Sequence, residues 1–460
     1  MGTSEKTLQR TALTIVCLGA FITPLMLSAV NVAIPTIAQG LKMDAITASW
    51  VPLAYLLSSG VFLLPFGRLG DMYGRKRMFL SGMTTVTVAS ILASFAPSPL
   101  VLILCRALQG MGAAMLFGTG IAILSSVYPP EKRGKVLGLS VSSVYLGLTC
   151  GPFAGGWVTQ QFGWRSVFVF HIPVVLLVII LGLINLKGEW RGPEGQKFDI
   201  PGALIYGAAV IALMYGFSIL PALSGFALIL LSGIGFAVFF RYEKGLQYPL
   251  FNVNLFSGNP VLTWSCVAAL IMYSSTFSVT FLMSLYLQNI REFTPQLAGL
   301  IMISQPLVMT LFSPVAGRMS DHYEPRLIAS SGMGLTAIGL AMLAVAGPLT
   351  QTELIVLTLM LVGFGFSLFS SPNTNAILSS VDKKYLGAAS GTVATMRVIG
   401  QMFSMGIVTL VFALMLGPVQ FSPEQHGQLL ASINASFIVA SALCFIGVYF
   451  SLKRGNLRAD

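Results

Sequence analysis

Long apolar segments recur along the whole chain, and each is near or above the roughly 20 residues that an α-helix needs to cross a bilayer. Short polar connections separate them. The pattern predicts an all-α polytopic membrane protein with fourteen transmembrane spans. A membrane β-barrel would instead show short segments of alternating hydrophobicity. The predicted spans are 12–34, 47–66, 78–96, 100–126, 136–158, 165–186, 201–219, 223–241, 260–287, 297–316, 327–346, 354–371, 388–412 and 430–452.

Composition supports this prediction. Of the 460 residues, 55% are hydrophobic and 9% are charged, whereas about a quarter of the residues of a soluble domain are charged. The termini and the even-numbered connections hold 21 of the 26 basic residues, which places both termini in the cytoplasm. Topology therefore explains the net charge of +11, and no nucleic-acid partner is implied. The five cysteines are dispersed through apolar segments, which argues against a disulfide framework or a metal site.

A short motif occurs twice in the chain. "GRLGDMYGRKR" (residues 67–77) follows the second span and "GRMSDHYEPR" (residues 317–326) follows the tenth, 250 residues later. Both fall at equivalent topological positions, which indicates an internal duplication. We expect two six-helix bundles, 1–187 and 246–460, joined by a segment, 188–245, that carries two inserted helices. Parallel repeats of this kind are typical of transporters that rock two halves about a central site.

The repeated loop contains candidate gating residues. Its glycines allow helix ends to approach closely, and Asp71 can accept from backbone amides at a neighbouring helix N-terminus or pair with Arg75. We expect these contacts to close the cytoplasmic side in one state and to break in the other. Lys76 and Arg77 are interpreted as anchors to lipid headgroups. The gating candidates of the two loops are Gly67, Asp71, Gly74, Arg75, Gly317 and Asp321.

The fifth span, "YLGLTCGPFAGGWV", contains a glycine stripe. Gly147, Gly151 and Gly155 recur every four residues, with Gly156 beside them, so another helix can pack closely against this face. Pro152 removes a backbone hydrogen bond and predicts a kink. The combination favours a bent helix that slides against its partner.

These motifs, together with Arg106–Ala114, resemble the signature motifs of the major facilitator superfamily. Fourteen spans and the segments "SAVNVAIP", "FDIPGAL", "YPLFNVNLF" and "SLYLQ" resemble its larger drug–proton antiporter branch, a family of multidrug exporters. The resemblance implies an inner-membrane exporter that uses the proton gradient and alternating access. One position departs from the pattern: relatives usually carry an aspartate five residues before the asparagine that is Asn31 here, and this chain has Met26.

Two arginines, Arg106 and Arg397, are the charged residues within the spans, because all 15 acidic residues fall in connections or at span edges. Intramembrane charges usually face a cavity. We expect Arg106 to do so, with snorkelling to the external interface as the alternative, and it matches the family's coupling arginine. Met26 is expected on an inward-facing strip with Ser28 and Asn31. The polar candidates for substrate binding or coupling are Asn31, Gln109, Gln305, Asn373, Asn375 and Gln401.

A cavity with arginines and no acid is electropositive. Arginine does not release its proton, so it cannot shuttle one. Protons could travel on an acidic group of the substrate or on an acid near a span end, such as Asp71 or Glu353; alternatively, transport is not proton-coupled. His171 is interpreted mainly as a structural polar residue, with proton carriage as the alternative.

The sequence therefore favours a secondary exporter of hydrophobic, neutral or anionic small molecules. The alternatives are a multidrug antiporter for lipophilic cations and an exporter of lipid-like or anionic metabolites without proton coupling. A channel fits a two-half protein poorly, and no cluster suited to an enzyme lies at membrane depth. We expect a monomer without cofactor or metal whose partners are the substrate, protons and membrane lipids.

Overall fold

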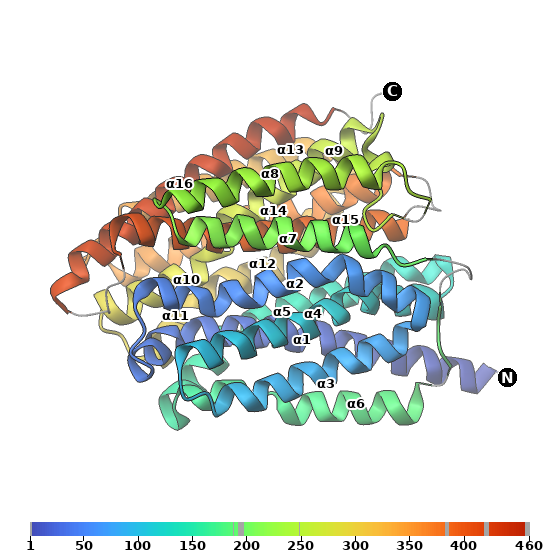
Figure 1. Cartoon of the computed structure of the whole chain (residues 1–460), viewed down its shortest axis with the longest axis horizontal. Coiled ribbons are helices and arrows are strands. Elements are labelled where there is room, and N and C mark those ends of the chain that lie inside the picture. Colours follow the sequence, from blue (N-terminus) through green and yellow to red (C-terminus); the bar gives the residue numbers. More distant parts are fainter. Residues whose placement is uncertain are drawn as a thin grey trace.

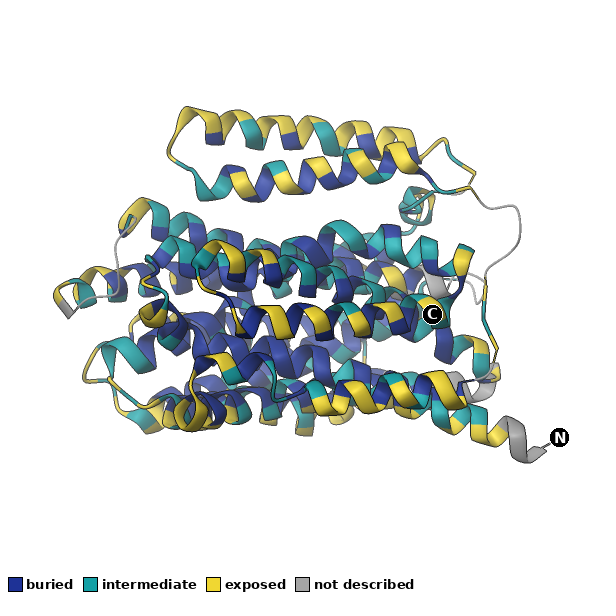
Figure 2. Ribbon diagram, turned by 60° about the horizontal axis from the view of Figure 1, so that its bottom comes forward, coloured by how far each residue is buried: buried dark blue, intermediate teal, exposed yellow. Residues whose placement is uncertain are grey.

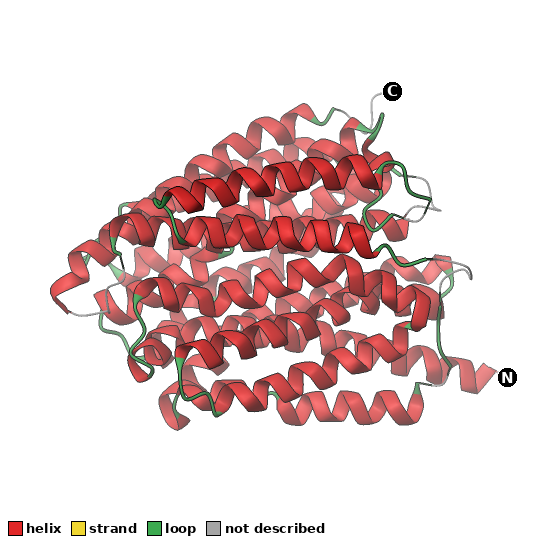
Figure 3. Cartoon of the chain, in the orientation of Figure 1, coloured by secondary structure: helices red, strands yellow, loops and turns green. Residues whose placement is uncertain are grey.

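The computed structural model describes residues 2–186, 188–191, 197–247, 249–381, 386–417 and 423–455, and within these ranges the regular elements are all helices (Figure 3). The first half comprises α1 (Gly2–Gly40), α2 (Ala45–Tyr73), α3 (Arg75–Ser94), α4 (Pro99–Val127), α5 (Pro130–Phe162), the short η1 (Trp164–Phe168) and α6 (Ile172–Asn185). A helical hairpin follows, formed by α7 (Ile200–Ser218) and α8 (Leu223–Glu243).

The second half is more interrupted. It comprises η2 (Val253–Phe256), α9 (Pro260–Thr276), α10 (Ser278–Leu285), η3 (Tyr286–Ile290), α11 (Pro295–Met302), α12 (Ser304–His322), α13 (Pro325–Ala344), α14 (Thr352–Ser379), α15 (Leu386–Met415), η5 (Pro423–Gln425) and α16 (His426–Lys453). The all-helical prediction is confirmed, and each of the fourteen predicted spans falls on one helix or one consecutive helical run. Thirteen helical runs of the described chain are long and apolar enough to cross a membrane. The predicted span that falls short is α3, whose basic first turn and many hydroxyl residues lower its hydropathy.

Local sequence explains where several helices begin. Asp44 accepts from Thr47 N at 2.7 Å before α2, and Asn259 accepts from Leu262 N at 2.9 Å before α9. These side chains satisfy amides that the first turn of a helix leaves free. A proline at the first helical position follows the cap in α4, α9 and α11, where its missing N–H costs nothing.

The helices of each half pack mainly with one another, and the α7–α8 hairpin packs its α7 side against α2 and α15 (Figures 1 and 2). Both chain ends lie on one side of the bundle, which we call the termini side; the opposite side is the far side (Figure 1). The proposed domain division into 1–187, 188–245 and 246–460 remains a prediction.

The duplication extends from the loops into the helix contacts. A methyl group on Gly110 of α4 would collide with Tyr55 O of α2, and one on Gly363 of α14 would collide with Gln305 O of α12. The two contacts are related by offsets of 250 and 253 residues. Further pairs repeat at the same offsets: Gly82 facing Gly112 and Gly332 facing Gly365, and Gly67 beside Gly118 and Gly317 beside Ser371. Both halves therefore place the same small residues where two backbones approach closely.

Candidate functional site

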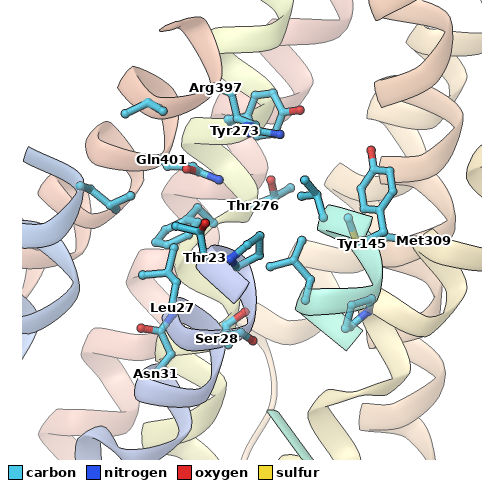
Figure 4. Close-up of a pocket in the computed structure, with 18 of the residues that line it drawn as sticks. Thr23, Leu27, Ser28, Asn31, Tyr145, Tyr273, Thr276, Met309, Arg397 and Gln401 are labelled. Atoms are coloured by element: carbon cyan, nitrogen blue, oxygen red, sulfur yellow. The ribbon is translucent and has the colours of Figure 1, made fainter. Parts of the chain in front are cut away.

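A cavity lies between the two halves, with an empty volume of about 1100 Å³ that includes space open to solvent (Figure 4). Helices α1, α2, α4 and α5 line it from the first half, and α9, α10, α11, α12, α14 and α15 line it from the second. Its polar or charged lining residues are Thr23, Ser28, Asn31, Tyr55, Ser59, Tyr145, Tyr273, Thr276, Thr280, Gln305, Arg397 and Gln401. Of the predicted residues, Asn31, Gln305, Arg397, Gln401 and Pro152 line the cavity.

Equivalent positions of the two repeats face each other across the cavity with different side chains. Tyr55 and Gln305 are equivalent, and both line it. Gly147 of α5 faces Phe21 O as Gly400 of α15 faces Leu270 O, and this offset of 253 makes Arg397 equivalent to Val144, which also lines the cavity. The duplicated scaffold therefore presents a charge from one half where the other half presents an apolar side chain.

Arg397 is the charged residue among the described side chains that line the cavity, and no carboxylate is among them. Its guanidinium carbon lies 5.6 Å from the centre of the Phe117 ring on α4, so it reaches across to the other half. Figure 4 shows Arg397, Tyr273 and Gln401 toward one end of the cavity, and Ser28 and Asn31 toward the other. The cavity is therefore electropositive at one end and polar but uncharged at the other.

Two lining atoms are buried without a hydrogen-bond partner in the described structure: Asn31 Oδ1 and Tyr55 Oη. Asn31 is 1% exposed and Tyr55 is 2% exposed. A buried polar atom without a partner costs free energy that a bound ligand or water can recover. Asn31 Oδ1 and Tyr55 Oη are therefore two unsatisfied polar atoms buried in the wall of the cavity.

Arg106 does not line the cavity. It is fully buried within the first half, where Nε donates to Val51 O at 3.1 Å and Nη1 donates to Gln109 Oε1 at 2.7 Å. Its guanidinium lies 4.6 Å from the centre of the Tyr55 ring. Arg106 was predicted to face the cavity, with snorkelling to the membrane surface as the alternative, and it does neither. It lies behind Tyr55, which separates it from the cavity.

The hydrogen bonds continue from Arg106 toward α6. Gln109 Nε2 donates to Ser90 Oγ at 2.8 Å, and Ser90 Oγ lies 3.3 Å from His171 Nε2 and 3.9 Å from Met26 Sδ. Gln109 and Met26 are thus placed in this buried network and not in the cavity, in contrast to the prediction. The lining stripe of α1 runs through positions 23, 24, 27, 28 and 31, and position 26 points about a quarter turn or more away from it.

The two predicted asparagines of α14 also lie outside the cavity. Asn375 Nδ2 donates to Ser320 Oγ at 2.7 Å, and Asn373 Oδ1 accepts from Arg454 Nη1 at 2.8 Å. Arg454 was missed at the sequence level, because a basic residue just after a span normally anchors at the membrane surface. It is 1% exposed. Burial lowers the pKa of the Arg454 guanidinium to about 10, so the group stays charged at neutral pH.

The predicted loop after α2 is a tight turn at Gly74, because Asp71 lies in the last turn of α2 and Arg75 begins α3. Asp71 Oδ1 accepts from Arg75 Nη2 at 2.7 Å, and Arg75 Nη1 donates to Ser126 Oγ at 2.6 Å, which ties the turn to α4. Asp71 was predicted either to accept from backbone amides at a helix N-terminus or to pair with Arg75. It pairs with Arg75 and does not cap a helix. Glu189 caps α3 instead, accepting from Lys76 N at 2.8 Å. The side chain of Asp321 lies outside the described residues.

Gly74 is required by this arrangement. Its φ is +125°, and a methyl group there would collide with the Glu189 carboxyl group. A backbone in this region favours glycine, and no larger side chain leaves room for the Glu189 cap.

The glycines of α5 pack against two partners. Gly147, Gly151 and Gly155 face the backbone of α1, where Cβ atoms would meet Phe21, Leu25 and Ala29. Gly156 faces Pro295 O of α11, and Gly299 of α11 faces Pro152 O in return. The glycine stripe therefore holds the first half together, while Gly156 and Pro152 contact the second half.

Several side-chain hydrogen bonds join the two halves, among them Tyr145 Oη with Ser370 Oγ, which lie 2.8 Å apart beside the cavity. Ser284 Oγ and Gln288 Nε2 both donate to Val32 O, at 3.1 and 2.8 Å. Ser49 Oγ and Thr409 Oγ1 lie 2.8 Å apart. The hydrogen bonds at Val32 and at Ser49 join the two halves toward the far side.

Comparisons with known proteins agree with this architecture. The family model described as Major Facilitator Superfamily matches residues 16–405 and again 265–458. The chain is 30% identical over 448 residues to the riboflavin transporter RibZ of Clostridioides difficile, covering 96% of each chain. It is 29% identical over 404 residues to the multidrug resistance protein Stp of Mycobacterium tuberculosis, covering 86% of this chain and 74% of that protein.

A solved structure shares the fold. It is a bacterial homolog of the human lysosomal transporter Spinster in an inward-facing and unoccupied conformation, with a TM-score of 0.69, 13% identity, and coverage of 98% of this chain and 97% of that one. The chain is a multi-pass membrane protein and belongs to the major facilitator superfamily.

Proposed function

We propose that the protein is a secondary exporter of hydrophobic small molecules, neutral or anionic, that works by alternating access with proton coupling. In this proposal it lies in the plasma (inner) membrane as a monomer among lipids, and the termini side faces the cytoplasm. The observation that carries the proposal is the cavity between two duplicated halves, with Arg397 as its charged lining residue and no lining carboxylate among the described residues.

The aromatic lining favours flat, apolar ligands. Tyr273 and Phe366 pack edge to face, with ring centres 5.5 Å apart, and Phe117 and Phe277 line the same space. Aromatic faces bind planar ligands and also contribute most of the contact area of small-molecule sites. Arg397 would hold an anionic or strongly polar edge of such a ligand, and Asn31 with Tyr55 would bind its other end.

The movement would use contacts already described. The far-side hydrogen bonds at Val32 and the close packing of Gly156 against α11 would break when the halves rock outward. Glycine surfaces suit such a movement because they have no side chains to interlock. The Asp71–Arg75 pair would then be free to exchange partners on the termini side.

Proton coupling requires a carrier that no lining side chain supplies. Asp71 is already paired with Arg75, and Glu353 lies exposed at the far-side start of α14. A proton carried on the exported molecule would move outward with it, against the inward gradient that drives export. We therefore propose that the inward-moving proton binds Asp71 when Arg75 leaves it. Arg106 would act through Tyr55, as a fixed charge that favours the anionic form of the bound molecule.

A second candidate is transport of a riboflavin-like compound, which the relative RibZ supports together with the aromatic lining of the cavity. Export of lipophilic cations remains the alternative that relatives such as Stp support. The cavity charge argues against cations, because a desolvated cation near Arg397 is repelled.

Transport in proteoliposomes tests these candidates. An imposed pH gradient would drive three fluorescent probes: an anionic xanthene dye, riboflavin and ethidium. We expect gradient-dependent movement of the anionic dye or riboflavin, reduced at least tenfold in Arg397→Gln and unchanged in Arg165→Gln, whose arginine lies outside the cavity. Movement of ethidium alone would overturn the proposal and favour a cation antiporter.

A further inference from the structure

Two buried carboxyl groups, Asp199 and Glu243, meet where the inserted hairpin begins and ends. Asp199 precedes α7 and is 9% exposed, and Glu243 ends α8 and is 1% exposed. Neither forms an ion pair in the described structure. Two acidic groups buried together without a cation need another way to offset their charge.

Each carboxyl group uses one oxygen for ordinary hydrogen bonds. Asp199 Oδ1 accepts from Gly202 N at 3.0 Å and from Tyr242 Oη at 3.2 Å, and Glu243 Oε2 accepts from Phe251 N at 3.1 Å. The other two oxygens, Asp199 Oδ2 and Glu243 Oε1, are buried and have no hydrogen-bond donor in the described structure.

These two free oxygens face the same point. A methyl group on Gly202 would collide with both Asp199 Oδ2 and Glu243 Oε1. Both atoms are acceptors when ionised, so a single proton between them satisfies both at once. Two carboxyl groups whose oxygens meet at one point do not both stay ionised without a cation, and such a pair titrates as one unit.

Among the residues that the structure describes, no basic side chain forms an ion pair with either carboxyl group. Tyr242 of α8 is the titratable side chain that faces the pair, and it donates to Asp199. Arg241 and Lys244 flank it in sequence but are exposed. Helix α2, which packs against α7, carries Arg68 and Asp71 near this end, and Asp71 is paired with Arg75.

We propose that Asp199 and Glu243 form one proton-binding site that closes the base of the inserted hairpin. The shared proton joins the start of α7 to the end of α8, and Glu243 Oε2 extends the contact to Phe251, in the segment that leads into α9. Loss of the proton as pH rises leaves two adjacent carboxylates, whose repulsion separates the two helix ends and releases the Phe251 amide. The site is independent of the transported substrate.

Infrared difference spectroscopy of the full chain in nanodiscs tests the shared proton. We expect a protonated-carboxyl band that disappears between about pH 5 and pH 9. The lower limit lies just above the range in which carboxyl groups ordinarily titrate, and the upper limit allows for burial and for repulsion by a second carboxylate. The band is expected in wild type and in Glu189→Gln, which removes the carboxyl group that caps α3. It should be absent from the near-isosteric double variant Asp199→Asn/Glu243→Gln. Its presence there, or its absence from wild type, would overturn the proposal.

Hydrogen exchange over residues 249–255, corrected for the intrinsic pH dependence, tests the closure. We expect protection to fall at least tenfold in wild type as the band disappears, and to be independent of pH in Glu243→Gln, whose amide oxygen still accepts from Phe251 N. If Asp199→Asn kept the wild-type response, the pair would not act as one unit. A rise in melting temperature on adding Ca²⁺ or Mg²⁺ that Glu243→Gln abolishes would show a cation site instead of a shared proton.

Discussion

Arg454 Nη1 donates to Asn373 Oδ1 at 2.8 Å, and this bond joins the last turn of α16 to α14 on the termini side. Arg454 Nη2 donates to Pro325 O at 2.8 Å, which adds the start of α13 to the same contact. The first half joins its third and sixth helices, α3 and α6, with the donor on the other helix. There Lys76 of α3 donates to Leu186 O, just after α6. One basic residue therefore ties the third and sixth helices of each half together.

Replacing Arg454 by alanine should lower the stability of the second half. The change leaves Asn373 Oδ1 and Pro325 O buried without donors, and each unsatisfied group costs about 1–3 kcal/mol. We expect a clear fall in the melting temperature of the purified protein. Lys453→Ala is the control, because the exposed Lys453 contacts Trp264 only through its ammonium group, 4.6 Å from the ring centre. Equal shifts for both variants would contradict the prediction.

Adding a methyl group at Gly110 should prevent correct packing of α4 against α2, since the methyl would collide with Tyr55 O. The equivalent change Gly363→Ala should have the same effect in the second half. Gly138→Ala on α5 is the matched control, because nothing lies within 4 Å of its added methyl, and alanine favours a helix by about 1 kcal/mol over glycine. The yield of monodisperse protein in detergent gives the readout. Normal yield of Gly110→Ala would show that the helices separate at little cost.

Removing the Gln288 side-chain amide should weaken closure of the far side, because Gln288 Nε2 donates to Val32 O of the other half. We expect Gln288→Ala to raise the rate at which a cysteine placed in the cavity reacts with an impermeant thiol reagent added from the far side. Gln428→Ala removes an exposed glutamine near the same face and serves as the control. An unchanged rate would mean that Ser284 and the packing of α5 against α11 suffice for closure.

Substituting lysine for Arg106 should impair transport even though the charge is kept. Lysine cannot donate to Val51 O and Gln109 Oε1 in the planar arrangement that the guanidinium provides. We expect transport rates at least tenfold lower in proteoliposomes, together with a fall in melting temperature because the buried Gln109 Oε1 loses its donor. Lys42→Arg, at the far-side end of α1, is a charge-conserving control outside the network. Wild-type transport by Arg106→Lys would show that only the charge matters.

Sequence reasoning predicted the helices and the duplication well, because hydropathy and repeated glycines are local signals. It placed Asn31, Gln305 and Arg397 on the cavity, where the structure has them. It placed Arg106 and Met26 there incorrectly, because a position on a helix does not reveal which of two buried faces contacts a neighbouring helix. Ser90 completes that network from α3, and a lone serine in a span carries no signal.

The same limit applies to residues at span ends. Arg454 and Glu243 both read as surface charges in the sequence, and both are almost fully buried. Arg454 donates to Asn373 Oδ1 and Pro325 O, which are far away along the chain, and Glu243 accepts from the backbone amide of Phe251. Every residue has backbone atoms, so the sequence does not reveal which of them is the partner. Only the three-dimensional arrangement shows that such charges are enclosed.

The position of Arg106 behind Tyr55 has an electrical consequence. A fully buried guanidinium without a carboxylate keeps its field, because neither water nor a counter-ion screens it well. That field extends through the Tyr55 ring into the space between the halves. The wall formed by the first half is therefore positively polarised although no charge is exposed on it, and neutralising Arg397 alone would lower the potential of the chamber without reversing its sign.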